Sequence, residues 1–311
     1  MTAGNTAGVD SSVMNLQGCG TALVTPFCAD GSLDERGLYD LARWQVESGI
    51  DWLLACGTTG ETPTLDEAEW LDVVRIVAEA AGGRVPVWAG CSHNSTKAAV
   101  AKARTAAQIP GVTAILSANP WYNKPTQEGQ FQHFKAVADA VKLPVVLYNI
   151  PGRSAANLEP ATVMRLAEAC PNIAAVKESS GNLVQITDLL TQAPRDFRVY
   201  SGDDVMTLGV LGVGGAGLVS VVSNLIPAEM GEMVRAALAN DWSMAREINR
   251  KYFRLMRGIF KETSPGPVKA ILAMMGRIGE HYRLPMVPVS PGTRTELERF
   301  ASEVGLLERS R

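Results

Sequence analysis

Histidines and closely spaced cysteines are scarce in this chain. Its 311 residues include three histidines, which are too few and too far apart to predict a zinc site. The cysteines are scattered: no two form a CxxC pair, and none is spaced from a histidine as in a zinc-binding motif. We therefore expect a reduced, cytoplasmic protein that holds no metal and no cofactor. The cysteines are Cys19, Cys28, Cys56, Cys91 and Cys170.

Long apolar runs and clusters of one charge are also missing. No uninterrupted apolar stretch reaches the roughly eighteen residues of a membrane-spanning helix, so no contact with a membrane is expected. Lysine and arginine total 29 against 32 acidic residues, and no basic run occurs, which argues against nucleic acid as the main partner. The first basic residue is Arg36, so the start lacks the charged region of a signal peptide. We expect residues 1–17 to form a loose leader.

Short apolar runs, by contrast, are frequent, and they alternate with amphipathic segments. Each run is continuous rather than alternating, as in strands that are covered on both faces. Their starts lie roughly 20–35 residues apart, which is one strand–helix unit. Eight such units predict an α/β fold: a (β/α)8 TIM barrel over residues 18–226, followed by C-terminal helices over residues 227–311. The runs are Thr21–Phe27, Trp52–Gly57, Val85–Gly90, Ala114–Pro120, Val145–Ile150, Ile173–Glu178, Arg198–Asp204 and Gly217–Ser223.

The amphipathic segments predict the helices. Thr64-Leu65-Asp66-Glu67 has the pattern of a capping box, in which a hydroxyl and a carboxylate satisfy free amides. Apolar residues then repeat along one face from Trp70 to Ala78, and Gly82-Gly83 end the helix. Further helices are expected around Pro227–Asn240, Met244–Arg257 and Pro267–Gly279.

A doubly wound open sheet is the main rival fold. Residues Gly212–Gly217 match GxGxxG, but a dinucleotide site needs those glycines after a strand and at the start of a helix. Here they follow a helical stretch and precede an apolar run. We expect them to allow close packing at the mouth of the barrel. A nicotinamide oxidoreductase stays an alternative, which a cofactor titration would reveal.

The carboxyl ends of the strands carry the chemistry in a barrel of this kind. Lys177 lies there, directly behind an apolar run. Partial desolvation would lower the pKa of its amine, and the neutral amine can attack a ketone to form a Schiff base. The alternative is a lysine that extends from the strand end into solvent.

Other polar residues at these ends would suit the same chemistry. The phenol of Tyr148 could shuttle protons, or it could be a core tyrosine with a satisfied hydroxyl. Thr58 and Thr59, flanked by glycines, could present hydroxyls and N–H groups to a carboxylate, or simply form a turn. Arg153 suits a second carboxylate, unless it is an ordinary surface arginine. Together they describe an amine nucleophile, a phenol, an anion cradle and an arginine.

Five motifs, in order and at matching spacing, closely resemble the dihydrodipicolinate synthase / N-acetylneuraminate lyase family of class I pyruvate-dependent aldolases. The resemblance covers nearly the whole chain. It implies a lyase (EC 4.3.3.7) that condenses pyruvate with L-aspartate 4-semialdehyde to 4-hydroxy-tetrahydrodipicolinate, the first committed step of the diaminopimelate route to lysine. The motifs are Gly57-Thr58-Thr59-Gly60-Glu61, Tyr122-Asn123-Lys124-Pro125-Thr126-Gln127-Glu128-Gly129, Tyr148-Asn149-Ile150-Pro151-Gly152-Arg153, Val176-Lys177-Glu178 and Ser201-Gly202-Asp203-Asp204.

The resemblance also implies catalytic roles. Lys177 would form the Schiff base with pyruvate, whose carboxylate would bind Thr59 and the amides of its turn. Tyr148 would relay protons with Thr58 and with Tyr122, which in this family arrives from the neighbouring subunit. The last role implies a homodimer with Tyr122 crossing the interface, paired again into a homotetramer.

Three more positions concern the substrates. By resemblance, the backbone carbonyl of Val219 faces the reacting centre, and Gly202 belongs to a motif typical of the synthases. Arg153 would serve the carboxylate of the semialdehyde, whereas sialic acid lyases and sugar-acid aldolases generally differ there. Arg153 thus favours the synthase branch over a related aldolase that uses a sugar-acid or hydroxy-acid aldehyde. A catalytically inactive scaffold would have lost Lys177 or Tyr148.

One regulatory site departs from the family pattern. In many members, feedback by lysine uses histidines and a glutamate. Here Glu67 and Trp70 stand at the histidine positions and Ala98 at the glutamate position, whereas Asn94 is retained. Without a glutamate to pair with an incoming ammonium, we expect weak or absent inhibition by lysine.

Overall fold

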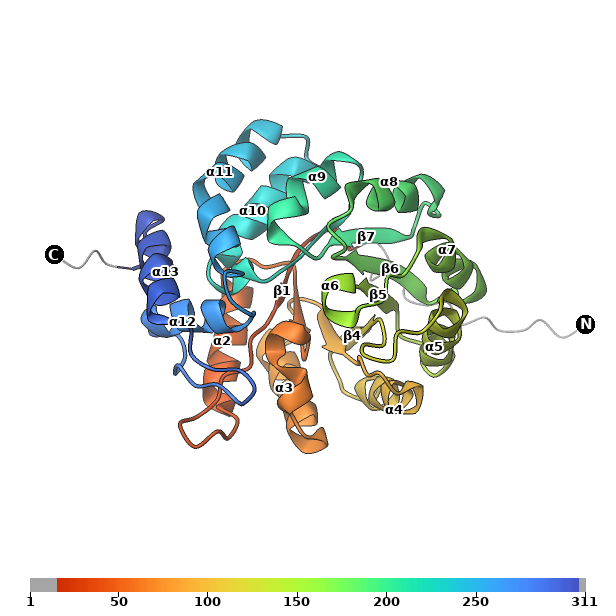
Figure 1. Cartoon of the computed structure of the whole chain (residues 1–311), viewed down its shortest axis with the longest axis horizontal. Helices are drawn as coiled ribbons and strands as arrows, with labels where there is room; N and C mark the ends of the chain where they lie inside the picture. The colour runs from red at the N-terminus through yellow and green to blue at the C-terminus, as the bar shows by residue number, and fades with distance from the viewer. Residues whose placement is uncertain (1–15, 308–311) are drawn as a thin grey trace, which may run out of the picture.

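A closed barrel of eight parallel strands forms the centre of the molecule, as the apolar runs predicted (Figure 1). The structure is a computed structural model, and it describes residues 16–307. The predicted leader over residues 1–17 therefore lies outside the described residues, apart from its last two. The strands are β1 (Gly18–Ala22), β2 (Trp52–Ala55), β3 (Val87–Gly90), β4 (Val112–Ala118), β5 (Val145–Asn149), β6 (Ile173–Glu178), β7 (Arg198–Ser201) and β8 (Gly217–Ser220).

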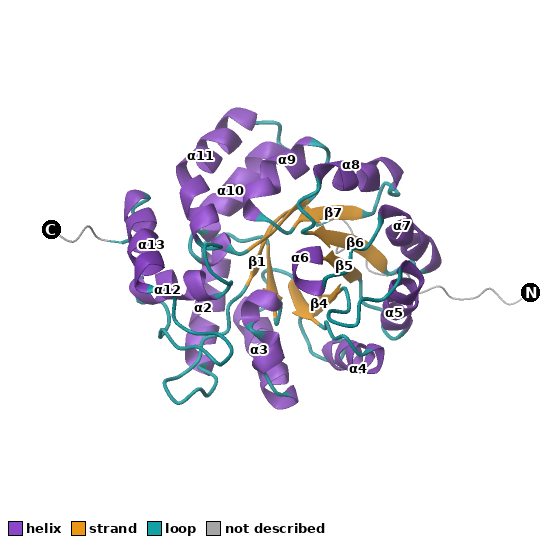
Figure 2. Ribbon diagram, viewed as in Figure 1, coloured by secondary structure: helices purple, strands orange, loops and turns teal. Residues whose placement is uncertain are grey.

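Helices surround the strands, and a further group follows the barrel (Figure 2). The α-helices of six or more residues in the described part up to residue 238 are α2 (Glu35–Glu47), α3 (Glu67–Ala81), α4 (Thr96–Ala106), α5 (Gln127–Asp139), α7 (Pro160–Ala169), α8 (Leu183–Gln192), α9 (Thr207–Gly212) and α10 (Pro227–Leu238). They are followed by α11 (Trp242–Gly258), α12 (Gly266–Met274) and α13 (Pro291–Glu303). None of the helices in residues 16–307 has the length and apolar character of a membrane span. The division of the chain at residues 226 and 227 stays a prediction.

The helix α13 was not predicted, and the first strand was misplaced. Only Leu297 and Ala301 of α13 are buried, so its sequence shows little apolar periodicity. The predicted run Thr21–Phe27 shares only two residues with β1, Thr21 and Ala22, because the strand begins at Gly18 and ends at Ala22. Glycines rarely indicate a strand. Here Gly20 is needed, since a Cβ on it would lie 1.9 Å from Trp52 Nε1.

The capping box of α3 lies two residues beyond the predicted one. The Asp66 carboxylate accepts from Glu69 N at 2.9 Å, and the Glu69 carboxylate accepts from Asp66 N at 3.2 Å. The predicted pair of Thr64 and Glu67 is therefore wrong, because Thr64 still belongs to a short 3-10 turn, η2 (Thr62–Thr64). The predicted end is confirmed: Gly82 closes the helix with a left-handed φ of 55°.

The GxGxxG match connects a helix to a strand. Gly212 ends α9 and Gly217 begins β8, which is the opposite order from a dinucleotide site. The expected close packing is confirmed, because a Cβ on Gly217 would lie 2.1 Å from the carbonyl oxygen of Gly18. Its expected place is wrong: β8 starts at Gly217, so the contact lies at the amino end of the barrel, not at the mouth.

Aromatic side chains fill the lumen of the barrel. The rings of Trp52 and Trp88 stack with centroids 5.0 Å apart, and Tyr200 packs on both at 5.4 and 5.5 Å. The Tyr200 hydroxyl donates to Leu16 O at 2.7 Å. Tyr200 also pairs in register with Lys177 on the neighbouring strand β6. The cluster thus closes the lumen beneath the strand ends and leaves their carboxyl side to polar groups.

Candidate active site

Two of the predicted residues lie side by side inside the barrel. Tyr148 on β5 and Lys177 on β6 are register partners, and each is 4% exposed. Lys177 Nζ lies 4.1 Å from the centre of the Tyr148 ring. The structure therefore brings the amine and the phenol together, and it contradicts the alternative of a lysine extended into solvent.

A missing side chain makes room for this amine. A Cβ on Gly202 would lie 2.8 Å from Lys177 Cε and 2.0 Å from Ser179 Oγ. Gly202 N donates to Glu178 O at 2.8 Å, which fixes the backbone there. The Ser179 hydroxyl is buried and has no hydrogen-bond partner among the residues that the structure describes. Sequence reasoning gave this hydroxyl no role, although it follows the lysine by two residues.

The turn with the two threonines is the 3-10 segment η1 (Thr58–Gly60), directly after β2. Thr59 is 5% exposed, and Thr58 is half-buried. The carbonyl of Gly60 accepts from Thr25 Oγ1 at 2.7 Å, and Glu61 N donates to Thr58 O at 3.1 Å. Bonds to both sides fix the turn, so its hydroxyls and amides are held in place for an anion.

A belt of polar groups supports the amine from outside the barrel. Asn149 and Glu178 directly follow Tyr148 and Lys177, so their side chains point to the opposite face of the sheet. Asn149 Nδ2 donates to both Glu178 carboxylate oxygens, at 3.2 and 3.1 Å. Gln185 Nε2 adds a bond of 3.0 Å to the same carboxylate. Sequence reasoning missed this belt. The pattern that could have indicated it is the polar residue that follows each of the two lumen residues in the sequence.

The carboxylate of Asp204 is also buried, and it lies beside the end of β8. The same strand carries Val219, which is fully buried in the lumen cluster that includes Tyr148. Asp204 accepts from Ser220 Oγ at 2.5 Å and from the amides of Val221 and Val222 at 3.1 and 3.2 Å. Burial raises the pKa of Asp204 to about 6, although these hydrogen bonds oppose the rise. The carboxylate ties the loop after β7 to the end of the strand that carries Val219.

Arg153 and Tyr122 are not in contact with this cluster. Arg153 lies in a short helix, α6 (Pro151–Ser154), which follows β5 and overlies the strand ends in Figure 1. It is exposed, and its Nη2 donates to Ser264 O at 3.2 Å. Tyr122, in the loop after β4, is 88% exposed and has a left-handed φ of 74°. Such a backbone conformation is unusual for a tyrosine.

Fold and site together define the class: a (β/α)8 barrel with a buried lysine amine and a tyrosine ring side by side on neighbouring strands. The chain belongs to the dihydrodipicolinate synthetase family, whose sequence model matches residues 15–304. It is accordingly a lyase.

Two curated relatives and one solved structure illustrate the similarity. The 4-hydroxy-tetrahydrodipicolinate synthase of Acidobacterium capsulatum is 69% identical over 294 residues, which cover 94% of this chain and 97% of the relative. The enzyme of the same name from Koribacter versatilis is 60% identical and covers 95% and 98%. The chloride-inhibited dihydrodipicolinate synthase of Acinetobacter baumannii, solved with pyruvate, superposes with a TM-score of 0.91 at 38% identity, over 94% of this chain and 99% of that one.

Proposed function

We propose that Lys177 is the residue through which this lyase binds and activates pyruvate. The chain condenses pyruvate with L-aspartate 4-semialdehyde to 4-hydroxy-tetrahydrodipicolinate, in the diaminopimelate route to lysine. The observation that carries the assignment is the buried Lys177 amine, 4.1 Å from the centre of the Tyr148 ring. The similar enzyme from Acinetobacter baumannii was solved in complex with pyruvate, which agrees with pyruvate as the first substrate.

The reaction begins at the amine. The neutral Lys177 amine attacks the ketone carbon of pyruvate, water leaves, and a protonated Schiff base forms. Loss of a methyl proton gives an enamine, whose carbon attacks the aldehyde of the semialdehyde. The amino group of the semialdehyde then displaces Lys177, which closes the ring and frees the enzyme. Each proton transfer needs an acid or base near the reacting atoms, and Tyr148 is positioned for this role.

The remaining site residues bind the two carboxylates and complete the relay. Thr59 and the amides of its turn hold the carboxylate of pyruvate, and Thr58 extends the proton relay from Tyr148. Arg153, on α6 above the strand ends, serves the carboxylate of the semialdehyde, because a guanidinium pairs well with a planar anion. Val219 offers its backbone carbonyl to the reacting centre, and Gly202, which has no side chain, leaves room there for Lys177.

The assembly and compartment follow from two further observations. Tyr122 is 88% exposed, which supports a role for this side chain at the active site of another subunit. We propose a homodimer in which the two Tyr122 side chains cross the interface, and a tetramer of two such dimers. All five cysteines are free thiols, which is typical of the reducing cytoplasm, where we place the enzyme.

Consumption of pyruvate by the purified protein tests this function. The semialdehyde is compared with N-acetylmannosamine and with small hydroxy-aldehydes, using wild type, Lys177→Ala and Lys142→Ala. Lys142 is exposed in the loop before β5, at the amino end of the barrel, so its variant is a matched control. We expect selective turnover of the semialdehyde that only Lys177→Ala abolishes. Turnover with another aldehyde alone would show that Arg153 was misread, and turnover in Lys177→Ala would contradict the assignment.

A further inference from the structure

A buried ion pair joins the C-terminal helix α12 to the turn with the two threonines. Lys269 Nζ on α12 lies 2.7 Å from the Glu61 carboxylate, and the two side chains are 0% and 1% exposed. The ammonium also donates to Thr25 O at 3.1 Å. The proposed mechanism uses neither charge, and both are remote in sequence from Lys177.

Both partners of Lys269 are bonded to the turn itself. Glu61 directly follows η1, and its N–H donates to Thr58 O at 3.1 Å. The hydroxyl of Thr25 donates to Gly60 O at 2.7 Å. Glu61 has a left-handed φ of 53°, a conformation that is unfavourable for a side chain and persists only where its surroundings enforce it. Lys269 therefore holds the turn at two points, once through Glu61 and once through Thr25.

Apolar rings and burial surround this ion pair. Burial lowers the pKa of the Lys269 ammonium, whereas the charge of Glu61 opposes that change. The rings of Phe27 and Tyr282 lie 4.5 and 5.2 Å from Lys269 Nζ and exclude water. Glu61 Oε2 has no hydrogen-bond partner within the part of the chain that the structure describes, so Lys269 is the main stabilising group for this carboxylate. A buried ion pair often adds little stability over an apolar pair of equal size, whereas the loss of one partner leaves an unpaired buried charge.

We propose that Glu61 and Lys269 are positioning residues, which hold the Thr58–Thr59 turn in the conformation that binds the carboxylate of pyruvate. The inference rests on the proposed role of Thr59. It makes the C-terminal helices part of the active-site architecture, because α12 fixes a turn that comes more than two hundred residues earlier in the chain. The pair contacts neither substrate itself.

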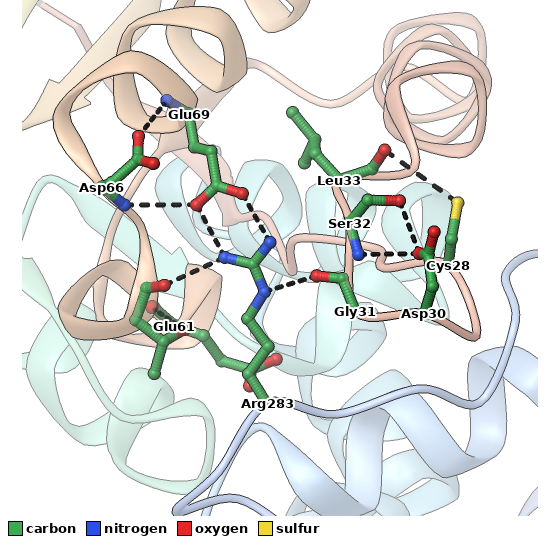
Figure 3. A network of polar contacts seen from close by, with 10 residues as sticks. Cys28, Asp30, Gly31, Ser32, Leu33, Glu61, Asp66, Glu69 and Arg283 are labelled. Carbon is green, nitrogen blue, oxygen red and sulfur yellow. Dashed lines mark hydrogen bonds and ion pairs between the residues drawn. The ribbon is translucent and has the colours of Figure 1, made fainter.

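A second ion pair provides the matched control. Arg283, in the loop before α13, binds Glu69 in the first turn of α3 at 2.5 Å, with side chains 17% and 25% exposed (Figure 3). Arg283 also donates to Gly31 O at 2.7 Å and to Thr64 O at 2.9 Å. Like Lys269, Arg283 links the C-terminal chain to the segment after β2. It has no hydrogen bond to the turn Thr58–Gly60 among the described contacts.

The test compares two double variants, Glu61→Gln/Lys269→Met and Glu69→Gln/Arg283→Met, in the full-length enzyme. Each removes one positive and one negative charge with little change in volume, so the net charge stays constant. We expect the first to raise the KM for pyruvate roughly tenfold, the scale of one lost charge-assisted hydrogen bond, while the KM for the semialdehyde stays within about twofold. The second should leave both KM values within about twofold. Melting temperatures are measured for both.

Results other than the expected one would each decide a separate question. An unchanged KM for pyruvate in Glu61→Gln/Lys269→Met, or an equal rise for both substrates, would overturn the inference. If that variant does not fold, Thr25→Val replaces it: this variant removes the hydroxyl bond to Gly60 alone and should raise only the KM for pyruvate. Borohydride trapping of pyruvate on wild-type Lys177 is run in parallel. Its failure would refute the proposed function, whereas its success with an unchanged KM would refute the positioning role alone.

Discussion

Lys177 Nζ lies 4.1 Å from the centre of the Tyr148 ring, across the register pair that joins β5 to β6. The aromatic face shields the amine from water on one side, and the lumen cluster closes the barrel beneath it. Because each residue is fixed on a strand, neither depends on a loop for its position. The outward-facing Asn149 and Glu178, joined by hydrogen bonds, lock the same two strands together.

Replacing Tyr148 by phenylalanine separates the ring from its hydroxyl. The ring still covers Lys177, so pyruvate should still form a Schiff base, whereas proton transfer loses its donor. We expect kcat to fall by about 10²-fold or more, within the range of general acid–base catalysis. Steady-state kinetics and borohydride trapping are measured together. A variant with normal kcat would exclude the phenol from the relay.

Mixing two inactive variants tests whether Tyr122 crosses the interface. Lys177→Ala supplies an intact Tyr122, and Tyr122→Phe supplies an intact Lys177. In a two-fold dimer each heterodimer has one complete site, so random reassociation should restore about a quarter of the wild-type activity. The mixture is assayed after dissociation and reassembly, with each variant alone as control. Absence of recovery in confirmed heterodimers would place Tyr122 in its own subunit's site or outside catalysis.

Asp204 predicts a stability change with pH. Burial raises its pKa from 3.8 to about 6, so the folded state keeps a proton that the unfolded state releases. The stability that Asp204 contributes is complete below about pH 4 and is lost as the pH rises through about 6, in total about 3 kcal/mol. Asp204→Asn cannot ionise; its amide oxygen can still accept from Val221 and Val222, and its NH2 group can donate to the Ser220 hydroxyl, which reverses that bond. The melting temperature of wild type should therefore fall relative to that of the variant as the pH rises from about 4 to about 6. Parallel curves of melting temperature against pH for the two proteins would show that Asp204 does not titrate there.

Inhibition by lysine should be weak. Trp70 is buried, its Nε1 donates to Gly90 O at 3.0 Å, and Lys102 Nζ already lies 5.6 Å from its ring. The ammonium group of a bound L-lysine would be repelled by Lys102, and Ala98 provides no carboxylate to pair with it. Titration with L-lysine at millimolar concentration should leave most of the activity, and Ala98→Glu should increase the sensitivity. Potent inhibition of the wild type would contradict the prediction.

The barrel was readable from the sequence because strands that are buried on both faces leave continuous apolar runs. β6, for instance, has the bounds of its predicted run, Ile173–Glu178. The exact ends of the helices were harder to predict. Asp66 rather than Thr64 caps α3, since two turns after β2 shift the start of the helix. The helix α13 has too few apolar positions to show a period.

The site was only partly predictable, because contacts distant in sequence leave no local pattern. Motifs indicated Lys177 and Tyr148, and the structure joins them. Nothing in the sequence near Glu61 indicates its partner, because Lys269 comes from a helix in the C-terminal part of the chain. The hydrogen bonds between Asn149 and Glu178 likewise required the strand register.

Reduction of the enzyme with borohydride in the presence of pyruvate tests the central claim most directly. The reagent converts a Schiff base into a stable secondary amine, which peptide mass spectrometry assigns to one residue. The account predicts a single pyruvate-derived adduct on Lys177 in wild type, none in Lys177→Ala, and the normal adduct in Lys142→Ala. An adduct on another lysine, or turnover without any adduct, would contradict it.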